Sequence, residues 1–167
     1  AAVDDTVSTK GVKAAGNLTL NGGSFTIDSA DDALHSNANL TITGGTYLIS
    51  TGDDGLHADG ALSVIDGSIQ ITESYEGIEG KTIDISGGDI EVVSSDDGLN
   101  AAGGNDRSGF GGNMGSDAFS ADSDIYIHIS GGTININASG DGVDSNGNLT
   151  VSGGQTFVSG PTNNGNG

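Results

Sequence analysis

The run Asp-Asp-Gly-Leu-His-Ala-Asp-Gly at residues 53–60 decides the fold, because its first five letters recur at a fixed interval. Asp-Asp-Ala-Leu-His occupies 31–35, Tyr-Glu-Gly-Ile-Glu occupies 75–79 and Asp-Asp-Gly-Leu-Asn occupies 96–100, so successive copies begin 22, 22 and 21 residues apart. Glycine pairs follow the same period, at 22–23, 44–45, 87–88, 131–132 and 153–154, with a degenerate Asp-Gly at 66–67. A repeat of this length with a strand in each unit is typical of a solenoid.

Aliphatic side chains fall at fixed offsets from the glycine pairs and alternate with polar residues, which indicates short strands on both sides of each pair. The aliphatic columns are Val12, Leu34, Leu56, Ile78, Leu99 and Val143; Leu18, Leu40, Leu62, Ile83, Ile127 and Leu149; Leu20, Ile42, Val64, Ile85, Ile129 and Val151; and Ile27, Ile49, Ile71, Val92, Ile136 and Val158. Such strands bury their apolar faces only by stacking on the coils above and below. We therefore predict an all-β parallel β-helix of about six to seven coils, forming one domain over 1–167 with an insertion at 101–124.

The composition limits the partners of this chain. Its formal net charge of −19, with only four Lys and Arg residues, excludes nucleic acid and an anionic membrane surface on electrostatic grounds. No apolar run is long enough to span a membrane, and there are no cysteines. Cations are the expected partners of such a chain.

The acidic residues are concentrated in the repeated motif, and we take the carboxylates there as candidate metal ligands: Asp31, Asp32, Asp53, Asp54, Glu76, Glu79, Asp96, Asp97, Asp141 and Asp144. Equivalent residues of a parallel stack lie about 4.8 Å apart, and like charges at that distance repel by about 1 kcal/mol in water and more in a protein. Clustered oxygen ligands favour Ca²⁺ as the neutralising ion. Zinc is disfavoured, because there is no cysteine and His35 and His57 lack a third nitrogen ligand.

The alternative is that Asp and Asn occupy these corners only because they suit tight turns and cap neighbouring amides. On the same view, His35 and His57 are stacked corner residues and not ligands, and the glycine pairs serve only the bend between two strands.

Several motifs together resemble a family of secreted bacterial carbohydrate-binding β-helix proteins. They are the run at 53–60, Ser-Tyr-Glu-Gly-Ile-Glu-Gly at 74–80, Ser-Asp-Asp-Gly-Leu-Asn at 95–100, Gly-Asp-Gly-Val-Asp-Ser-Asn-Gly at 140–147 and Gly-Pro-Thr-Asn-Asn-Gly-Asn-Gly at 160–167, and the resemblance spans about residues 30–167. It implies a right-handed helix shaped like a pectate lyase, Ca²⁺ bound at the acidic corners, and an extracellular or cell-surface protein that adheres to cellulose or polygalacturonate. In the family the last of these segments leads into a further coil, whereas the sequence given stops there.

Glycan-binding candidates are few, because aromatic residues make up only 4% of the chain. We assign Tyr75, Lys81, Arg107 and Phe110 to this role. A calcium-dependent polysaccharide lyase would need a basic residue as its base, and only Lys81, Arg107, Lys10 and Lys13 are available. We favour a binding protein over an enzyme, since Lys81 more simply serves as a charge partner for Glu76 or Glu79.

A structural role is the main alternative. Residues 1–9 and 161–167 are short and polar and do not resemble the caps that block the ends of β-helices. Uncovered ends favour head-to-tail stacking of copies into a homopolymeric filament.

Overall fold

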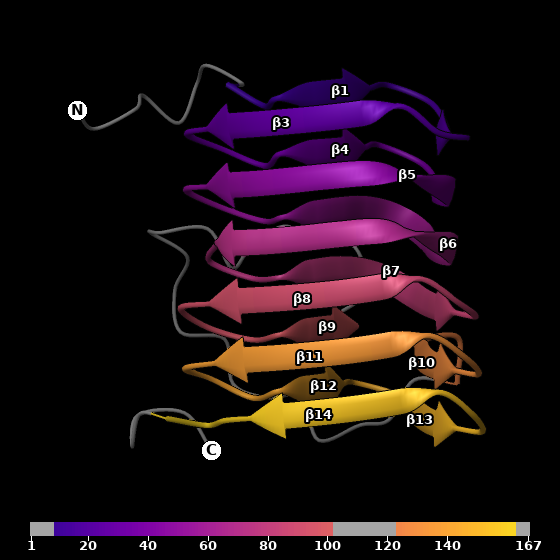
Figure 1. The fold of residues 1–167 in the computed structure, drawn as a ribbon. Helices are drawn as coiled ribbons and strands as arrows, with labels where there is room; N and C mark the ends of the chain where they lie inside the picture. Colours follow the sequence, from indigo (N-terminus) through magenta and orange to yellow (C-terminus); the bar gives the residue numbers. More distant parts are fainter. Residues whose placement is uncertain (1–8, 102–122, 163–167) are drawn as a thin grey trace.

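The computed structural model describes residues 9–101 and 123–162, which form a β-solenoid of about six turns (Figure 1). The regular structure in these residues consists of strands: β1 Val12–Ala14, β2 Leu18–Leu20, β3 Ser24–Ser29, β4 Leu34–Ser36, β5 Leu40–Thr51, β6 Leu56–Glu73, β7 Ile78–Ile85, β8 Asp89–Ser94, β9 Leu99–Ala101, β10 Tyr126–Ile129, β11 Thr133–Ala138, β12 Val143–Ser145, β13 Asn148–Val151 and β14 Gln155–Ser159. In Figure 1 the near strands run from right to left, and the far strands run back from left to right, while the chain descends. The winding is therefore right-handed.

Each coil contributes to three stacks of parallel strands. We call them the corner stack (β1, β4, the start of β6, the start of β7, β9 and β12), the second stack (β2, the start of β5, the middle of β6, the end of β7, β10 and β13) and the third stack (β3, the ends of β5 and β6, β8, β11 and β14). Every pairing is parallel, and equivalent residues face one another, as Leu34 faces Leu56 and Leu40 faces Leu62. The predicted parallel β-helix is confirmed.

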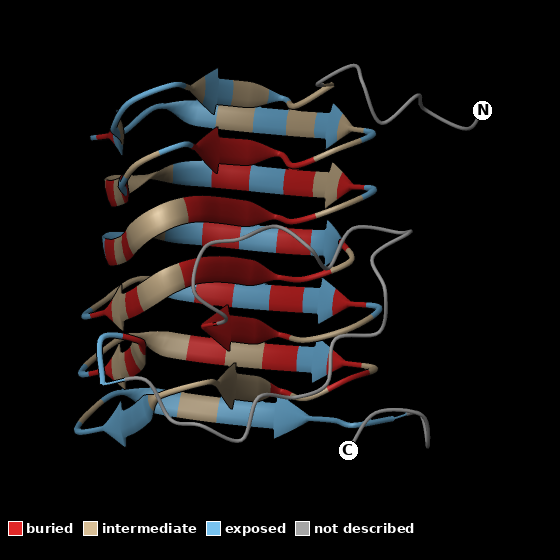
Figure 2. Ribbon diagram, turned by 180° about the vertical axis from the view of Figure 1, so that it is seen from behind, coloured by how far each residue is buried: buried red, intermediate tan, exposed pale blue. Residues whose placement is uncertain are grey.

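The aliphatic columns form the core that the sequence predicts. In the middle coils their side chains are fully buried, as at Leu56, Ile71, Ile78 and Ile83. Figure 2 shows this burial on alternate positions of the strands of the third stack. Each such side chain contributes about 1.5–3 kcal/mol to stability by leaving water. The narrow core is long because each coil adds the same set of side chains.

The glycine pairs form the bends between the second and third stacks, as predicted. The second glycine of each pair has a positive φ, for example 107° at Gly45 and 84° at Gly132. This conformation strains any residue with a Cβ. The same holds at the degenerate Asp66-Gly67, where Gly67 has φ 126°.

The predicted insertion at 101–124 lies between two strands that belong to one coil. Ala101 ends β9 and is buried, so the coil extends one residue into the range assigned to the insertion. The same coil continues with β10 in the second stack, where Tyr126 faces Thr82 and Ile127 faces Ile83 of β7. The intervening residues 102–122 lie outside the described part of the chain.

No described segment is helical, and so none forms an apolar helix long enough to cross a membrane.

Candidate functional site

Two rows of polar side chains follow the corner stack. The first corner row lies in the turns before the strands and contains Lys10, Asp32, Asp54, Glu76, Asp97 and Asp141. The second corner row lies in register on the strands and contains Lys13, His35, His57, Glu79, Asn100 and Asp144. The other predicted ligands, Asp31, Asp53 and Asp96, each precede a residue of the first row and are half-buried. The structure thus brings the ten predicted ligands to one edge of the solenoid.

The middle of both corner rows is buried. Asp54 and His57 are 0% exposed, and Glu76 and Glu79 are 2% and 1% exposed. A glycine follows each acid of the first row except Asp32, which is followed by Ala33. A Cβ at Gly55 would lie 2.5 Å from Ile71 Cδ1 and 2.6 Å from the carbonyl oxygen of Gly77, so only glycine lets this turn press against the core.

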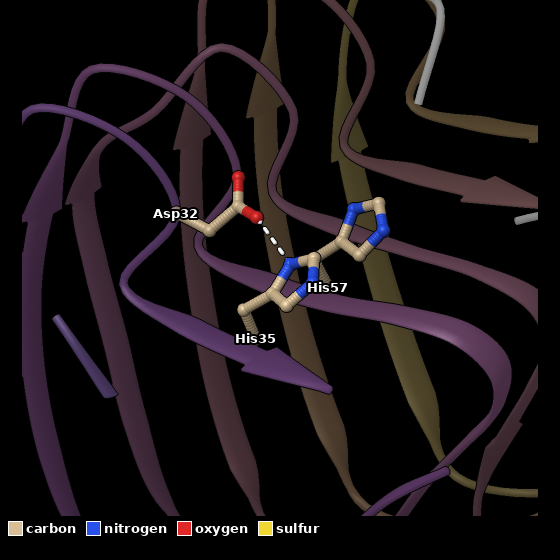
Figure 3. Close-up of side chains that lie close together, drawn as sticks. All are labelled: Asp32, His35 and His57. Carbon is tan, nitrogen blue, oxygen red and sulfur yellow. Dashed lines mark hydrogen bonds and ion pairs between the residues drawn. The ribbon is translucent and has the colours of Figure 1, made fainter. Parts of the chain in front are cut away.

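Two acids at the first coils contact a lysine. Lys10 Nζ lies 2.8 Å from Asp31 Oδ1 and 2.6 Å from Asp32 Oδ2. His35 Nδ1 also lies 2.6 Å from Asp32 Oδ2, as Figure 3 shows. Burial alone would raise the pKa of Asp32, but the hydrogen bonds from His35 and Lys10 lower it to about 2. Asp32 is therefore a carboxylate at neutral pH.

The two corner histidines stack, as the simpler alternative predicts. The rings of His35 and His57 lie 4.7 Å apart between centroids and 12° from parallel, and Figure 3 shows them side by side. Stacking does not remove them from the polar network, because each ring also contacts carboxylates.

His57 is surrounded by three carboxylates. Its Nδ1 lies 3.0 Å from Asp54 Oδ2 and 2.7 Å from Glu79 Oε2, while its Nε2 lies 3.2 Å from Asp59 Oδ1. Burial alone would lower the pKa of His57, but the contacts with Asp54 and Glu79 raise it to about 11. Burial raises the pKa of Asp54, and the charge of Glu79 adds to that rise.

Among the described residues, Glu76 and Asp97 of the later coils form no ion pair with a lysine or a histidine. Burial and the charge of Glu79 raise the pKa of Glu76 to about 9, although Asn100 Nδ2 donates a hydrogen bond to its carboxylate. Burial and the neighbouring acids, among them Asp96, raise the pKa of Asp97 to about 7. Negative charge is thus partly compensated by lysine at the first coils and in excess at the later ones. Sequence reasoning did not find this gradient, because it depends on which side chains reach the next coil.

Three groups of side chains in the described residues bring ligand atoms within 4.8 Å of one another: Asp31 with Asp32 and Asp53, Asp32 with His35 and His57, and Asp54 with His57 and Glu79. The first group consists of carboxylates only, and two of its members are half-buried, which fits the hard oxygen ligands of Ca²⁺. Asp96, Asp97, Asp141 and Asp144 form no group of this kind in the described ranges.

The predicted glycan-binding residues do not form one site. Tyr75 is half-buried, and burial together with a hydrogen bond to Asp96 raises the pKa of its hydroxyl. Lys81 is half-buried on β7 and has no ion pair with Glu76 or Glu79, so the simpler interpretation of Lys81 is wrong. Arg107 and Phe110 lie outside the described residues.

A polar cluster on the outer face of the second stack was missed. Tyr126 Oη donates a 2.8 Å hydrogen bond to Asp84 Oδ2, and His128 contacts both Asp84, at 3.5 Å, and Ser152 Oγ, at 2.9 Å. Lys81 precedes Thr82, the register partner of Tyr126. The signal was present in the sequence, because Asp84 and His128 occupy the same outward column across the insertion, but only the inward columns were followed.

The comparisons with known proteins give one finding. The model of a family described as "Carbohydrate-binding domain-containing protein" matches residues 1–55. This range includes the first two coils of the described structure, which end with β5 at Thr51. Neither a curated protein nor a solved structure matches the chain. The match supports the carbohydrate-binding part of the family resemblance and does not extend to calcium or to a particular glycan.

Proposed function

We propose that this chain is an extracellular, calcium-stabilised β-solenoid that binds plant-type or acidic polysaccharide without cleaving it. The observation that carries the proposal is the match of the carbohydrate-binding family to the first two coils. Those coils have the same strands and register as the coils that follow, so the matched unit is the repeating unit of the whole solenoid.

The outer face of the second stack supplies groups that suit a sugar. Tyr126 is a half-buried aromatic residue beside the hydrogen-bonding groups of Asp84 and His128. Sugar recognition uses such a combination of an apolar surface with few, fixed polar groups. Lys81 would add a positive charge for a uronate carboxylate, since no described carboxylate forms an ion pair with it.

Calcium belongs to this proposal as a structural ion. Asp31, Asp32 and Asp53 would hold it once Lys10 Nζ moves away from Asp31 and Asp32, and Asp97 would be a second place of attraction. When bound, the ion would supply positive charge to the corner and crosslink neighbouring coils. The chain's own contribution is to present carboxylates from successive coils at one edge.

The test is a pull-down of the purified chain on cellulose and on polygalacturonate, with an assay for unsaturated uronate products in parallel. We expect retention on at least one polysaccharide and no product. Tyr126→Ala and Lys81→Met should weaken retention, whereas Tyr47→Phe, at a buried ring in the core, should not. Absence of retention on both materials, or product formation abolished in Lys81→Met, would contradict the proposal.

A filament subunit is the second candidate, and a charge pattern favours it. Both corner rows begin with lysine and end with aspartate, from Lys10 to Asp141 and from Lys13 to Asp144. Head-to-tail stacking would place the lysines of one copy beside the aspartates of another. Within the chain, Lys10 already forms such ion pairs with the adjacent coil.

Apolar exposure in the last described coil adds to this pattern. Leu149, Val151 and Val158 continue the core columns, yet they are 51%, 60% and 48% exposed. A second copy, or a further coil of a longer chain, would cover them. Electron microscopy of the purified chain in Ca²⁺ should show filaments that Val151→Asp abolishes and Ile65→Asp, at an equally exposed position on the side of the solenoid, leaves intact. Monodisperse monomers of the unmodified chain would exclude this role.

A further inference from the structure

The strongest unassigned chemistry lies at His57, in the interior of the corner stack. Two carboxylate oxygens, Asp54 Oδ2 and Glu79 Oε2, face the same ring nitrogen, Nδ1, at 3.0 and 2.7 Å. One N–H cannot donate fully to both oxygens. The ligand atoms of the three residues converge within 4.8 Å, and the three side chains are at most 1% exposed.

Two buried carboxylate oxygens in this cluster are poorly satisfied. Asp54 Oδ1 has no hydrogen bond, and Glu79 Oε2 meets only Nδ1 of His57, which also faces Asp54 Oδ2. Buried carboxylate oxygens in native proteins are almost always satisfied, and an unsatisfied one calls for an unplaced water, proton or ion. These atoms belong to the side chains that converge on His57, so the deficit lies at the cluster itself.

Asp59 orients the ring in the manner of a metal-bound histidine. His57 Nε2 lies 3.2 Å from Asp59 Oδ1, and Asp59 is partly exposed. Histidine ligands commonly donate their second N–H to a carboxylate, which fixes the tautomer and leaves the other nitrogen free to bind. With Nε2–H directed to Asp59, the lone pair of Nδ1 faces two anions, and only a proton or a cation can lie between them.

We propose that Asp54, His57 and Glu79 form a buried site for a divalent transition-metal ion of the Zn²⁺ class, separate from the carboxylate corner proposed for Ca²⁺. Imidazole nitrogen together with carboxylate oxygen is a donor set that Zn²⁺ accepts and Ca²⁺ does not prefer. A third nitrogen, which sequence reasoning required, is unnecessary when one histidine and two carboxylates supply three protein ligands. Water takes the fourth position in zinc sites with three protein ligands. Bonds of about 2.0–2.2 Å to a tetrahedral ion place the ligand atoms about 3.3–3.6 Å apart, so Nδ1 and Glu79 Oε2, now 2.7 Å apart, must separate by about 0.6–0.9 Å.

The neighbouring group of Asp32 with His35 and His57 is a poorer site. Asp32 already contacts Lys10 Nζ and His35 Nδ1, both at 2.6 Å, so its charge is compensated. Asp54 and Glu79 have no lysine among the described residues. The excess negative charge therefore favours the deeper group.

The experiment is a calorimetric titration of the chelator-treated, full chain with Zn²⁺, followed by Co²⁺ as an absorbing probe. We expect one Zn²⁺ per chain, release of about one proton from His57 on binding, and visible Co²⁺ bands of a nitrogen- and oxygen-ligated ion. His57→Gln should lower Zn²⁺ affinity at least tenfold. His128→Gln, which removes a histidine from the outer face, should bind as the unmodified chain does.

Because His57→Gln leaves two buried acids facing each other, Glu79→Gln serves as the second variant. It removes one negative charge from a crowded site, so its circular dichroism and melting should remain native while Zn²⁺ affinity falls at least tenfold. No Zn²⁺ binding by the unmodified chain, or equal affinity in folded Glu79→Gln, would overturn the site. Equal loss in His128→Gln would assign binding to surface histidines instead. These outcomes are independent of polysaccharide and Ca²⁺ binding.

Discussion

His57 Nδ1 lies 2.7 Å from Glu79 Oε2, across two successive coils and without exposure to solvent. The pair lies between the first coils, where Lys10 contacts Asp31 and Asp32, and the later coils, where the acids are in excess. In the absence of metal, the imidazolium of His57 is the cation nearest to Glu79 and Asp54. The charge balance of these two buried acids therefore depends on this one ring.

Replacing the ring should destabilise the metal-free chain. His57→Gln leaves Asp54 and Glu79 buried without their cation, and breaking a buried ion pair in this way costs about 3–5 kcal/mol. His128→Gln is the matched control, with a side chain 40% exposed, and should change the free energy of unfolding by less than about 0.5 kcal/mol. Urea unfolding followed by circular dichroism measures both. Equal stability of the two variants would show that His57 carries no buried charge.

The metal-free chain should lose stability as the pH rises from 5 to 9. The pKa values of Glu76 and Asp97 are raised to about 9 and about 7 from ordinary values of 4.5 and 3.8, so the folded state binds more protons than the unfolded state in this range. His57, raised to about 11 from 6.5, acts in the same direction. The free energy of unfolding decreases as the pH rises wherever the folded state binds more protons than the unfolded state.

Asp32 limits stability at low pH, because its pKa is lowered from 3.8 to about 2 in the folded state. Its contribution to stability is fully present above pH 3.8 and is lost as the pH falls towards 2. Calorimetric melting in chelator should therefore show a maximum between these ranges. Glu76→Gln should flatten the decline at higher pH, and Asp28→Asn, at an exposed position on β3, should leave it unchanged. A melting temperature that rises from pH 5 to pH 9 would contradict the assignment of protons to Glu76 and Asp97.

Calcium should raise the melting temperature of the unmodified chain at neutral pH. A ligand at 100 times its Kd stabilises a folded protein by about 2.7 kcal/mol. Asp53→Asn should reduce the gain, because it removes a half-buried carboxylate from the group with Asp31 and Asp32. Asp66→Asn, at an exposed bend on another edge, should keep the full gain. Melting curves that are identical in Ca²⁺ and in excess chelator would leave the outer carboxylates with a turn-forming role only.

The bends should tolerate no side chain at the second glycine. Gly132 has φ 84°, and a Cβ there would lie 2.9 Å from the carbonyl oxygens of Gly87 and Gly88. Gly132→Ala should cost about 1–3 kcal/mol, because strain adds to the clash with backbone. Gly16→Ala, where a Cβ would meet nothing within 4 Å, should be neutral or stabilising by up to about 1 kcal/mol. Thermal unfolding of both variants checks the difference.

The sequence by itself determined the solenoid. Parallel stacking requires equivalent residues at equal offsets, so the columns that contain Leu56 and Ile71 specify strands, register and core together. It also determined the edge at which the acids gather, since the Asp-Asp doublets repeat with the same period as the core. The bend at each glycine pair followed from the need for a positive φ.

Tertiary structure decided the electrostatic character of that edge. Asp53 and Asp54 are neighbours in the sequence, yet one is half-buried and the other has no exposure. Whether an acid is compensated depends on a side chain from the adjacent coil, as with Lys10 at Asp32 and His57 at Glu79. Repeats in a sequence give the order of the coils, whereas a pKa depends on distances of a few ångströms and on burial, which arise only when the coils are stacked.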